Sequence, residues 1–440
     1  MNNLEYTNKI AVVQPLQTIK KKHISLITKI KNIYVYFFIF AIIYIEFGYH
    51  MVVENQLNGT IRTFLLIILP LPLCLLERTR FRSINITSSI LFFYFLVLIL
   101  LNGLRDNNLS NYILLLVPVY LGFMVSWLIN IQIFIKFFCR IMLFLASYSL
   151  IVFIVGFLFP SLIEQLPFLG YRLDSKAEVH DALFSVFLTN TIYIRNYGFA
   201  WEPGAFALLN CFALYFVGMS REQFRIGYIV IFTLTIVTTF STMGYAVMAG
   251  IYIVLINKLC NQKQKRKMLK IGGIFLVGCI VVLSVPSIRD VVFSKLRGLF
   301  LESDGEISYT TQARLDAIIY PFKAFLASPI IGIGYDSFTI LNIEKCNGVA
   351  TNTILNWFAL FGSLFGLPCI YFYLRVFLKH AKIFKLNIFC IIILLLSFIL
   401  LLSTESLLRI SLIYIIIFYS AQDVSWSRDI HENSLYFRSL

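Results

Sequence analysis

The chain has 440 residues, of which 59% are hydrophobic and only 13% are charged. Soluble domains carry roughly 25% charged residues, and a soluble fold of this composition would expose much of its apolar surface to water. The composition therefore excludes a soluble globular protein and indicates an integral membrane protein. The net charge of +15 is then expected on cytoplasmic loops, and we expect no nucleic-acid partner.

Residues 1–32 are polar and basic without the pattern of a cleavable signal, so we expect a cytoplasmic N-terminal segment. About twelve apolar stretches follow, each long enough to cross roughly 30 Å of hydrocarbon. They lie near 33–53, 61–76, 84–102, 110–129, 138–159, 203–219, 225–241, 243–257, 271–286, 352–374, 386–402 and 404–420. We therefore predict an all-α fold with a single transmembrane domain over 33–420 and a cytoplasmic tail over 421–440.

The charges give an independent test of this topology. If both termini are cytoplasmic, 25 of the 37 Lys and Arg residues fall in the N-terminal segment, the inside loops and the tail. Short cytoplasmic loops of multi-pass proteins are enriched in Lys and Arg. An even number of spans with both termini inside is therefore favoured.

Two long segments, about 160–202 and 287–351, fall on the outside in this topology. Loops of such length are usually functional or disordered. Within the second loop, apolar residues recur at helical spacing over 308–329. This pattern predicts an amphipathic helix over 308–327 that lies along the outer interface or covers the bundle, with Arg314 facing the bundle cavity.

The sequence shows no nucleotide-binding loop, no cluster of His and Cys at metal-ligand spacing and no DxD pair in the long loops. We therefore expect no cofactor and no metal. Outside arginines are exceptions to the charge rule, and a guanidinium matches phosphate geometry. Four of them are candidates for binding a lipid-linked phosphate or diphosphate: Arg195, Arg297, Arg314 and Arg409. The alternative is simple pairing with the external acids. For Arg409, the spacing from Glu405 favours a helical ion pair, and we interpret Glu46 as structural.

The segment 194–215 combines Arg195 with Glu202 and Pro203 at the start of an apolar helix. Glu202 is a candidate catalytic carboxylate, or it stabilises the helix start through the dipole. Aromatic side chains alternate just before it, at Tyr197 and Trp201 among others. They are candidates for a sugar-binding surface or for an interfacial aromatic belt.

Four motifs in order resemble the O-antigen polymerase and O-antigen ligase superfamily. RNYGFAWEPGAFA (195–207) is similar to its R-x-x-G-x-x-x-E-P-G-x-x-A segment, and FSTMGYAVMAG (240–250) to its S-T-x-G helix start. The stretch from Arg314 through SPIIGIGYDSF (328–338) resembles its long external loop, and TNTILNWFALFGSLFG (351–366) its following helix. The resemblance implies a GT-C-type glycosyltransferase architecture and a metal-independent enzyme of the bacterial cytoplasmic (inner) membrane.

By this resemblance the donor is an undecaprenyl-diphosphate-linked oligosaccharide, and a chain-length regulator protein is a candidate partner. The ligase pattern has a His before Asn352, where this chain has Thr351. That His is the candidate base in ligases, so its absence favours a polymerase of O antigen or capsule over an O-antigen ligase. A flippase or exporter of lipid-linked oligosaccharide is the alternative from another class. The expected catalytic residues are Arg195, Glu202 and Arg314, and the expected substrate-binding residues are Tyr197, Trp201, Arg297, Asn352 and Arg409.

Overall fold

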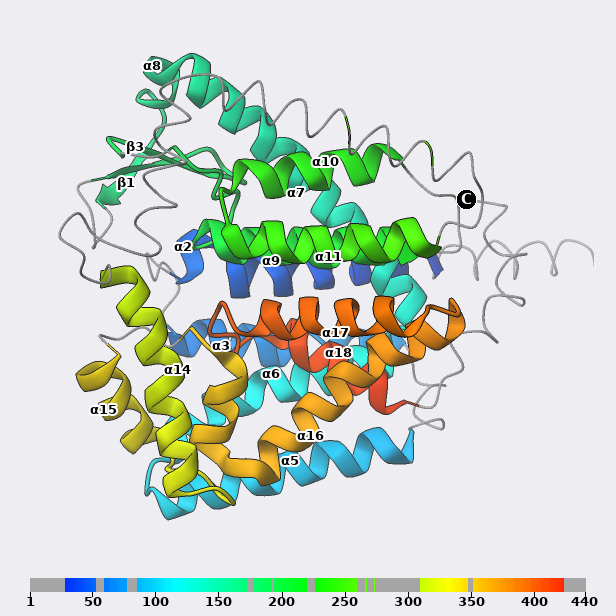
Figure 1. The fold of residues 1–440 in the computed structure, drawn as a ribbon, viewed down its shortest axis with the longest axis vertical. Helices are drawn as coiled ribbons and strands as arrows, with labels where there is room; N and C mark the ends of the chain where they lie inside the picture. Colours follow the sequence, from blue (N-terminus) through cyan, green and yellow to red (C-terminus); the bar gives the residue numbers. More distant parts are fainter. Residues whose placement is uncertain are drawn as a thin grey trace, which may run out of the picture.

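The structure is a computed structural model that describes residues 28–52, 59–76, 85–171, 177–191, 194–219, 226–258, 309–346 and 351–422, together with residues 266 and 273. Most described residues are helical, and the long helices lie side by side (Figure 1). The helices are Thr28–Phe47, α2 (Tyr49–Val52), α3 (Gly59–Ile68), α4 (Leu71–Leu76), α5 (Ile86–Arg105), α6 (Leu109–Leu128), α7 (Ile131–Leu158), α8 (Pro160–Ile163), α9 (Pro203–Met219), α10 (Ile226–Thr238), α11 (Thr242–Lys258), α14 (Tyr309–Ala327), α15 (Tyr335–Lys345), α16 (Thr353–Ile383), α17 (Ile388–Leu402) and α18 (Ser411–Ala421).

Six helical segments are long and apolar enough to cross a membrane, and five shorter apolar helices accompany them. The six are Thr28–Phe47, Gly59–Leu76, α5, α6, α7 and α16. The five are α9, α10, α11, α17 and α18. These helices coincide with all the expected spans except 271–286, which lies outside the described residues. The chain is therefore a multi-pass helical protein, and the number of about twelve crossings stays a prediction.

The two most enclosed helices form the centre of the bundle. All residues of α18 and nearly all of α9 are buried, and a helix that is apolar on every side is a core helix. Helix α18 packs against α6 and α16, whereas α9 packs against α10 and α11. Asparagine side chains cap the N-termini of α5, α6, α7, α16 and α17, so the chain marks these helix starts with a residue suited to them.

The expectation of a purely helical fold is wrong in one place. The first long loop, which we expect outside, contains a three-stranded antiparallel sheet of β1 (Phe168–Tyr171), β2 (Glu178–Asp181) and β3 (Val186–Thr189). Both faces of this sheet are covered. One face packs against Tyr49, whereas Phe187 on the other packs against Val152 of α7. Each strand has only four residues, which is too short for a clear alternating pattern.

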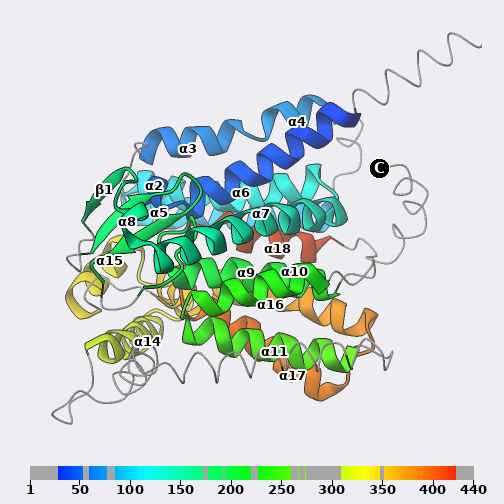
Figure 2. The same cartoon turned by 90° about the horizontal axis from the view of Figure 1, so that it is seen from above.

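The sheet, α8, α14 and α15 all lie at one end of the bundle (Figures 1 and 2). Helix α14 runs across the ends of the bundle helices (Figure 1), and its bounds confirm the predicted helix over 308–327. Its small residues Ala313 and Ala317 are buried, while Ile318 and Phe322 are exposed. Because α14 packs on α16, the large apolar residues point away from the bundle, as expected of a helix at a lipid interface.

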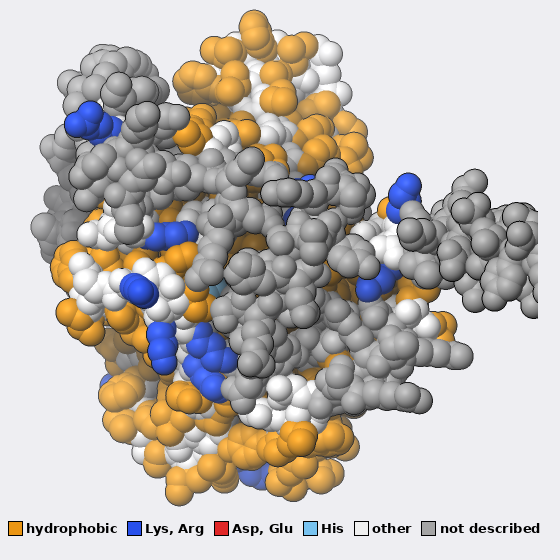
Figure 3. All heavy atoms as spheres, turned by 90° about the vertical axis from the view of Figure 1, so that its right-hand side faces the viewer, with side chains coloured by type: hydrophobic (Ala, Val, Ile, Leu, Met, Phe, Trp, Pro, Cys, Tyr) orange, Lys and Arg blue, Asp and Glu red, His pale blue; other side chains and the backbone are white. Residues whose placement is uncertain are grey.

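The opposite end of the bundle is basic. Figure 3 shows Lys and Arg side chains gathered there, and no acidic side chain is visible among the described atoms of this face. Lys258 ends α11 and Lys382 lies in the last turn of α16. The described parts of the two long loops thus lie at one end of the bundle, and this basic face lies at the other.

Candidate functional site

Two glycine-containing segments join the described part of the second long loop to a break in α16. Gly362 has a φ of 68° and interrupts that helix. The turn at Gly332, with a φ of 70°, fits into the break, and a Cβ on either glycine would collide with the backbone of the other segment. Ser363 N donates to Pro329 O over 2.8 Å and Ile333 N donates to Ala359 O over 2.8 Å. The P-x-x-G-x-G turn is therefore fixed by main-chain hydrogen bonds.

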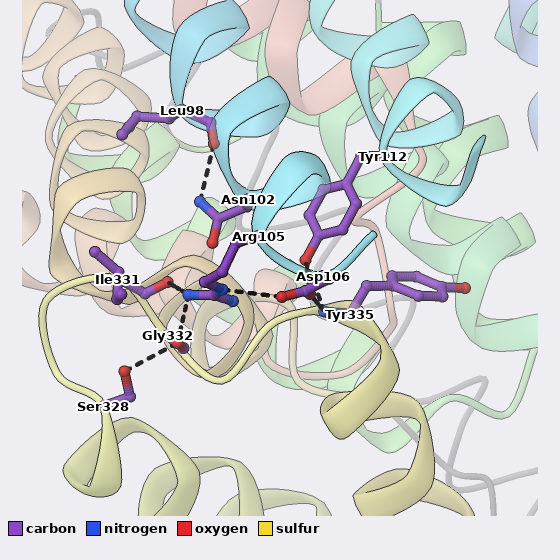
Figure 4. A network of polar contacts seen from close by, with 9 residues as sticks. All are labelled: Leu98, Asn102, Arg105, Asp106, Tyr112, Ser328, Ile331, Gly332 and Tyr335. Carbon is purple, nitrogen blue, oxygen red and sulfur yellow. Dashed lines mark hydrogen bonds and ion pairs between the residues drawn. The ribbon is translucent and has the colours of Figure 1, made fainter. Parts of the chain in front are cut away.

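A polar network ties the same turn to the corner between α5 and α6 (Figure 4). Arg105 Nη1 donates to Gly332 O over 3.2 Å, and its Nε donates to Asp106 Oδ1 over 2.9 Å. Asp106 Oδ2 accepts hydrogen bonds from the Tyr112 hydroxyl and from Tyr335 N, the latter over 3.0 Å. We call Arg105, Asp106 and Tyr112 the corner network. It fixes the first residue of α15.

Tyr335 in turn holds Arg409. A guanidinium nitrogen of Arg409 donates to the Tyr335 hydroxyl over 2.6 Å, and the guanidinium lies 5.6 Å from the ring centroid. The expected helical ion pair between Glu405 and Arg409 is wrong, because α17 ends at Leu402 and α18 begins only at Ser411. In the connecting loop, Arg409 binds the Tyr335 hydroxyl, whereas the Glu405 side chain lies against Gly204 at the start of α9.

Arg195 lies where the first external segment meets the end of α10. Its Nε donates to Thr239 O over 3.0 Å and an Nη donates to Phe240 O over 3.4 Å. The adjacent Asn196 is buried and its side-chain amide binds Thr238 Oγ1 over 3.0 Å. Arg195 is therefore anchored by carbonyls that follow α10, at the S-T-x-G helix start recognised in the sequence.

The aromatic strip before α9 packs against the end of the first helix. Tyr49 N donates to Phe199 O over 2.7 Å, Trp201 N donates to Phe47 O over 3.1 Å, and the Trp201 ring stacks on Phe47 with centroids 5.1 Å apart. Tyr197 is buried in the cluster beneath the sheet. This burial favours a packing role for Tyr197, whereas Trp201 keeps a partly exposed ring.

Two carboxyl groups meet at the start of α9. Glu202 O accepts the hydrogen bond of Phe206 N in the first turn of the helix. Glu405 is only 7% exposed, and its Oε1 occupies the space where a Cβ on Gly204 would lie. Thr353 Oγ1 donates to Glu405 O and accepts from Leu407 N over 2.8 Å. The first residue of α16 thus holds the main-chain carbonyl of Glu405 and the N–H two residues after it.

Three ionisable side chains, Glu202, Arg314 and Arg195, act on the buried carboxyl group of Glu405. Burial raises the pKa of Glu405 well above its usual range, and the charge of Glu202 and a hydrogen bond to Glu202 raise it further. The positive charges of Arg314 and Arg195 act in the opposite direction on this pKa without reversing it. Arg195, Glu202, Arg314 and Glu405 therefore form one electrostatic cluster, which we call the outer cluster.

Three further residues were expected at the site: Arg314, Asn352 and Arg297. Arg314 is exposed on α14, yet its charge reaches the buried Glu405. Asn352 is buried and caps α16, where its Oδ1 accepts from Leu355 N over 3.0 Å. Arg297 lies outside the described residues. Within the described ranges, no three His, Cys, Asp or Glu residues are grouped so as to hold a metal ion.

Sequence reasoning missed Glu405 as a site residue because its spacing from Arg409 pointed to a local ion pair. The signal that could have found it was an acid in the short turn between two strongly apolar helices, since a charge there needs a nearby partner. Its partners are distant in sequence, and only the fold brings them together.

Residues 227–367 match the model of a protein family described as O-antigen ligase. The match covers about a third of the chain and includes α10, α11, α14, α15 and the first part of α16. It confirms the resemblance to the O-antigen ligase and polymerase superfamily that the four motifs indicated. It points to a glycosyltransferase-like enzyme acting on a glycan in the membrane. A search of curated proteins found no match to the chain.

Proposed function

We propose that this protein is a surface-polysaccharide polymerase. In this proposal it joins undecaprenyl-diphosphate-linked repeat units of O antigen or capsule at the outer face of the bacterial cytoplasmic membrane, with both termini in the cytoplasm. The observation that carries the proposal is the outer cluster. There, Arg195 from the first long loop and Arg314 from the second act on the same buried carboxyl group, that of Glu405.

The chemistry follows from the charges. The donor already carries a good leaving group, so the enzyme has to position two sugars and stabilise the charge that develops on the departing diphosphate. Arg195 and Arg314 supply two guanidinium forks for that anion. Glu202 is hydrogen-bonded to Glu405, on which both arginines act, and it is the candidate base for the acceptor hydroxyl. No metal is needed in this scheme, because arginines neutralise the diphosphate.

The second candidate is an O-antigen ligase, which uses the same donor and a lipid A-core acceptor. The match to a family described as O-antigen ligase favours it. Thr351, at the position where ligases carry His, favours the polymerase. Both enzymes would use the outer cluster for the donor diphosphate, so the acceptor separates them.

The test is transfer by the purified protein in lipid nanodiscs. A polymerase lengthens chains when given one lipid-linked repeat unit alone, in the presence of EDTA. A ligase leaves that substrate unchanged and forms product only when lipid A-core is added. Movement of the intact lipid-linked unit between leaflets, without a new glycosidic bond under either condition, would contradict both proposals and favour a flippase.

A further inference from the structure

The outer cluster contains two carboxyl groups, and the structure fixes one against the other. Glu405 is held by Thr353 through its backbone and rests over Gly204 through Oε1. Gly204 is two residues after Glu202, and a hydrogen bond joins the Glu202 and Glu405 side chains. The fold therefore holds the Glu405 carboxyl group against the start of α9.

Two carboxyl groups in contact tend to share a proton when one of them is buried, because two adjacent negative charges repel strongly where water is excluded. The groups acting on Glu405 are Glu202, Arg314 and Arg195, and burial together with Glu202 outweighs the two arginines. The pKa of Glu405 is therefore raised, and this carboxyl holds a proton more tightly than an ordinary glutamate does. Glu405 donates the hydrogen bond and Glu202 accepts it.

The shared proton also sets the net charge of the site. With one proton on the pair, two guanidinium groups face one carboxylate, and the outer cluster has a net charge of +1. With both carboxyl groups ionised, the cluster would be neutral, and its attraction for a diphosphate would be weaker. Retention of the proton by Glu405 therefore favours binding of an anionic donor.

We propose that Glu202 and Glu405 work as one carboxyl pair in glycosyl transfer, with Glu202 as the catalytic base and Glu405 as its positioning partner. This inference rests on the proposed function. Glu202 takes the proton of the acceptor hydroxyl as that oxygen forms its bond to the anomeric carbon of the donor. The bond between that carbon and the diphosphate oxygen breaks, and its electron pair leaves with the diphosphate between Arg195 and Arg314.

Thr351 stands where ligases carry the candidate base His, and it cannot act as a base itself. The carboxyl pair would supply the base instead. A threonine hydroxyl does not accept a proton at neutral pH, whereas a carboxylate beside the acceptor does. Thr353, two residues further on, instead holds the backbone of Glu405. Thr353 at the start of α16 thus positions Glu405, the partner of the base Glu202, and α16 does not supply a base itself.

The experiment compares the wild type with Glu202→Gln, Glu405→Gln and the control Glu344→Gln in chain formation from one lipid-linked repeat unit, over a range of pH. Glu344 is an exposed glutamate on α15 at the same end of the bundle. We expect Glu202→Gln to lower kcat by roughly 10²- to 10⁴-fold with little change in KM. We expect Glu405→Gln to keep kcat within about tenfold of the wild type, because the amide still donates a hydrogen bond to Glu202.

The pH profile identifies the pair. In the wild type, KM for the donor should rise at alkaline pH when Glu405 loses its proton, and in Glu405→Gln this rise should disappear. Glu344→Gln should follow the wild type. An unchanged alkaline rise in Glu405→Gln, or wild-type kcat in Glu202→Gln, would overturn the pair. Absence of any glycosidic product with the wild-type protein would instead overturn the proposed function.

A measurement without turnover keeps the inference testable if a variant is inactive. In infrared spectra of the protein labelled with ¹³C-glutamate at pH 7, the difference between wild type and Glu405→Gln should contain one band of a protonated carboxyl group. Melting curves establish that each variant is folded. A folded Glu405→Gln protein that keeps the full band shows that the proton resides elsewhere and refutes the pair.

Discussion

The Tyr335 hydroxyl lies 2.6 Å from a guanidinium nitrogen of Arg409, and the main-chain N–H of the same tyrosine donates to Asp106. Tyr335 therefore connects the corner network to a cation in the loop that also carries Glu405. An arginine side chain loses much rotamer freedom when it is held. Tyr335 already holds the Arg409 side chain, so less conformational entropy would be lost when Arg409 binds an anionic substrate as proposed.

Tyr335→Phe removes the hydroxyl and keeps both the ring and the hydrogen bond of the main chain. We expect KM for the lipid-linked donor to rise by about three- to tenfold, the equivalent of one ordinary hydrogen bond, with kcat and the melting temperature nearly unchanged. The control is Tyr371→Phe, an exposed tyrosine on α16 whose ring also lies near an arginine, Arg375. Equal KM values for the two variants would contradict a role for Tyr335 in holding Arg409.

Asp106→Asn should weaken the corner network. Burial raises the pKa of Asp106, but hydrogen bonds from Arg105, Tyr112 and Tyr335 N outweigh it and leave the pKa below its usual value. A depressed pKa in the folded state means that the stabilisation is present at neutral pH and is lost as pH falls through that value. We expect Asp106→Asn to cost about 1–3 kcal/mol and to abolish this acid-dependent loss.

Thermal unfolding in detergent, followed between neutral pH and pH 3, checks the Asp106 prediction. Asp336→Asn is the matched control, because Asp336 is an exposed acid at the same corner that accepts a hydrogen bond from Asn108. It should change stability by less than about 0.5 kcal/mol. If Asp106→Asn and Asp336→Asn behave alike across this range, the corner network does not stabilise the fold.

Gly362→Ala should disrupt the contact between the external loop and α16. Its positive φ costs a non-glycine residue about 1–3 kcal/mol, and the new Cβ would collide with the main chain at Ile330. The contrast is Gly59→Ala, because no atom lies near a Cβ at that position of α3. We expect a lower melting temperature and faster proteolysis near residue 330 for Gly362→Ala only. Normal stability of this variant would show that the break in α16 is not required.

Much of the helical framework could be predicted from the sequence, because apolar runs of membrane length and asparagine caps are local signals. The helix over 309–327 was predicted from its spacing alone. The sheet was not, because four-residue strands carry too little pattern. The local rule failed at Glu405 and Arg409, since a spacing of four residues brings side chains together only in a helix, and Ser403 ends α17 before that spacing begins.

The candidate site, like the fold, could be predicted from the sequence only in part. Arg195, Glu202 and Arg314 could be selected from motifs and from their place in the predicted topology. Their relation to Glu405 could not, because it depends on how the loop after α17 folds over the start of α9. Long-range electrostatic partners are a property of packing and are absent from the sequence pattern.

The topology can be tested with single cysteines and an impermeant maleimide applied to intact cells. A cysteine at Ile340, exposed on α15, should be labelled from outside, whereas one at Lys382, near the basic end of α16, should react only after permeabilisation. The reason is that short cytoplasmic loops retain Lys and Arg. The reverse labelling pattern would place the outer cluster in the cytoplasm and contradict the proposed site of polymerisation.

The last prediction concerns the two arginines of the outer cluster. Arg314→Ala should reduce chain formation by roughly 10²-fold or more, since loss of one preformed donor to a developing anion costs that much. Arg314→Lys should restore little activity, because an ammonium group cannot form the bidentate contact of a guanidinium. The control is Lys323→Ala on the same helix, where the exposed lysine lies 5.4 Å from the Tyr320 ring centroid.

Arg195 needs a stability measurement beside the activity assay, because its guanidinium also binds Thr239 O and Phe240 O at the end of α10. Loss of those hydrogen bonds alone would lower the melting temperature of Arg195→Ala. A role in diphosphate binding predicts more: weaker binding of undecaprenyl diphosphate to folded Arg195→Ala protein at a temperature where it remains fully folded. If folded Arg195→Ala and Arg314→Ala proteins bind this lipid as tightly as Lys323→Ala does, the outer cluster does not hold the diphosphate.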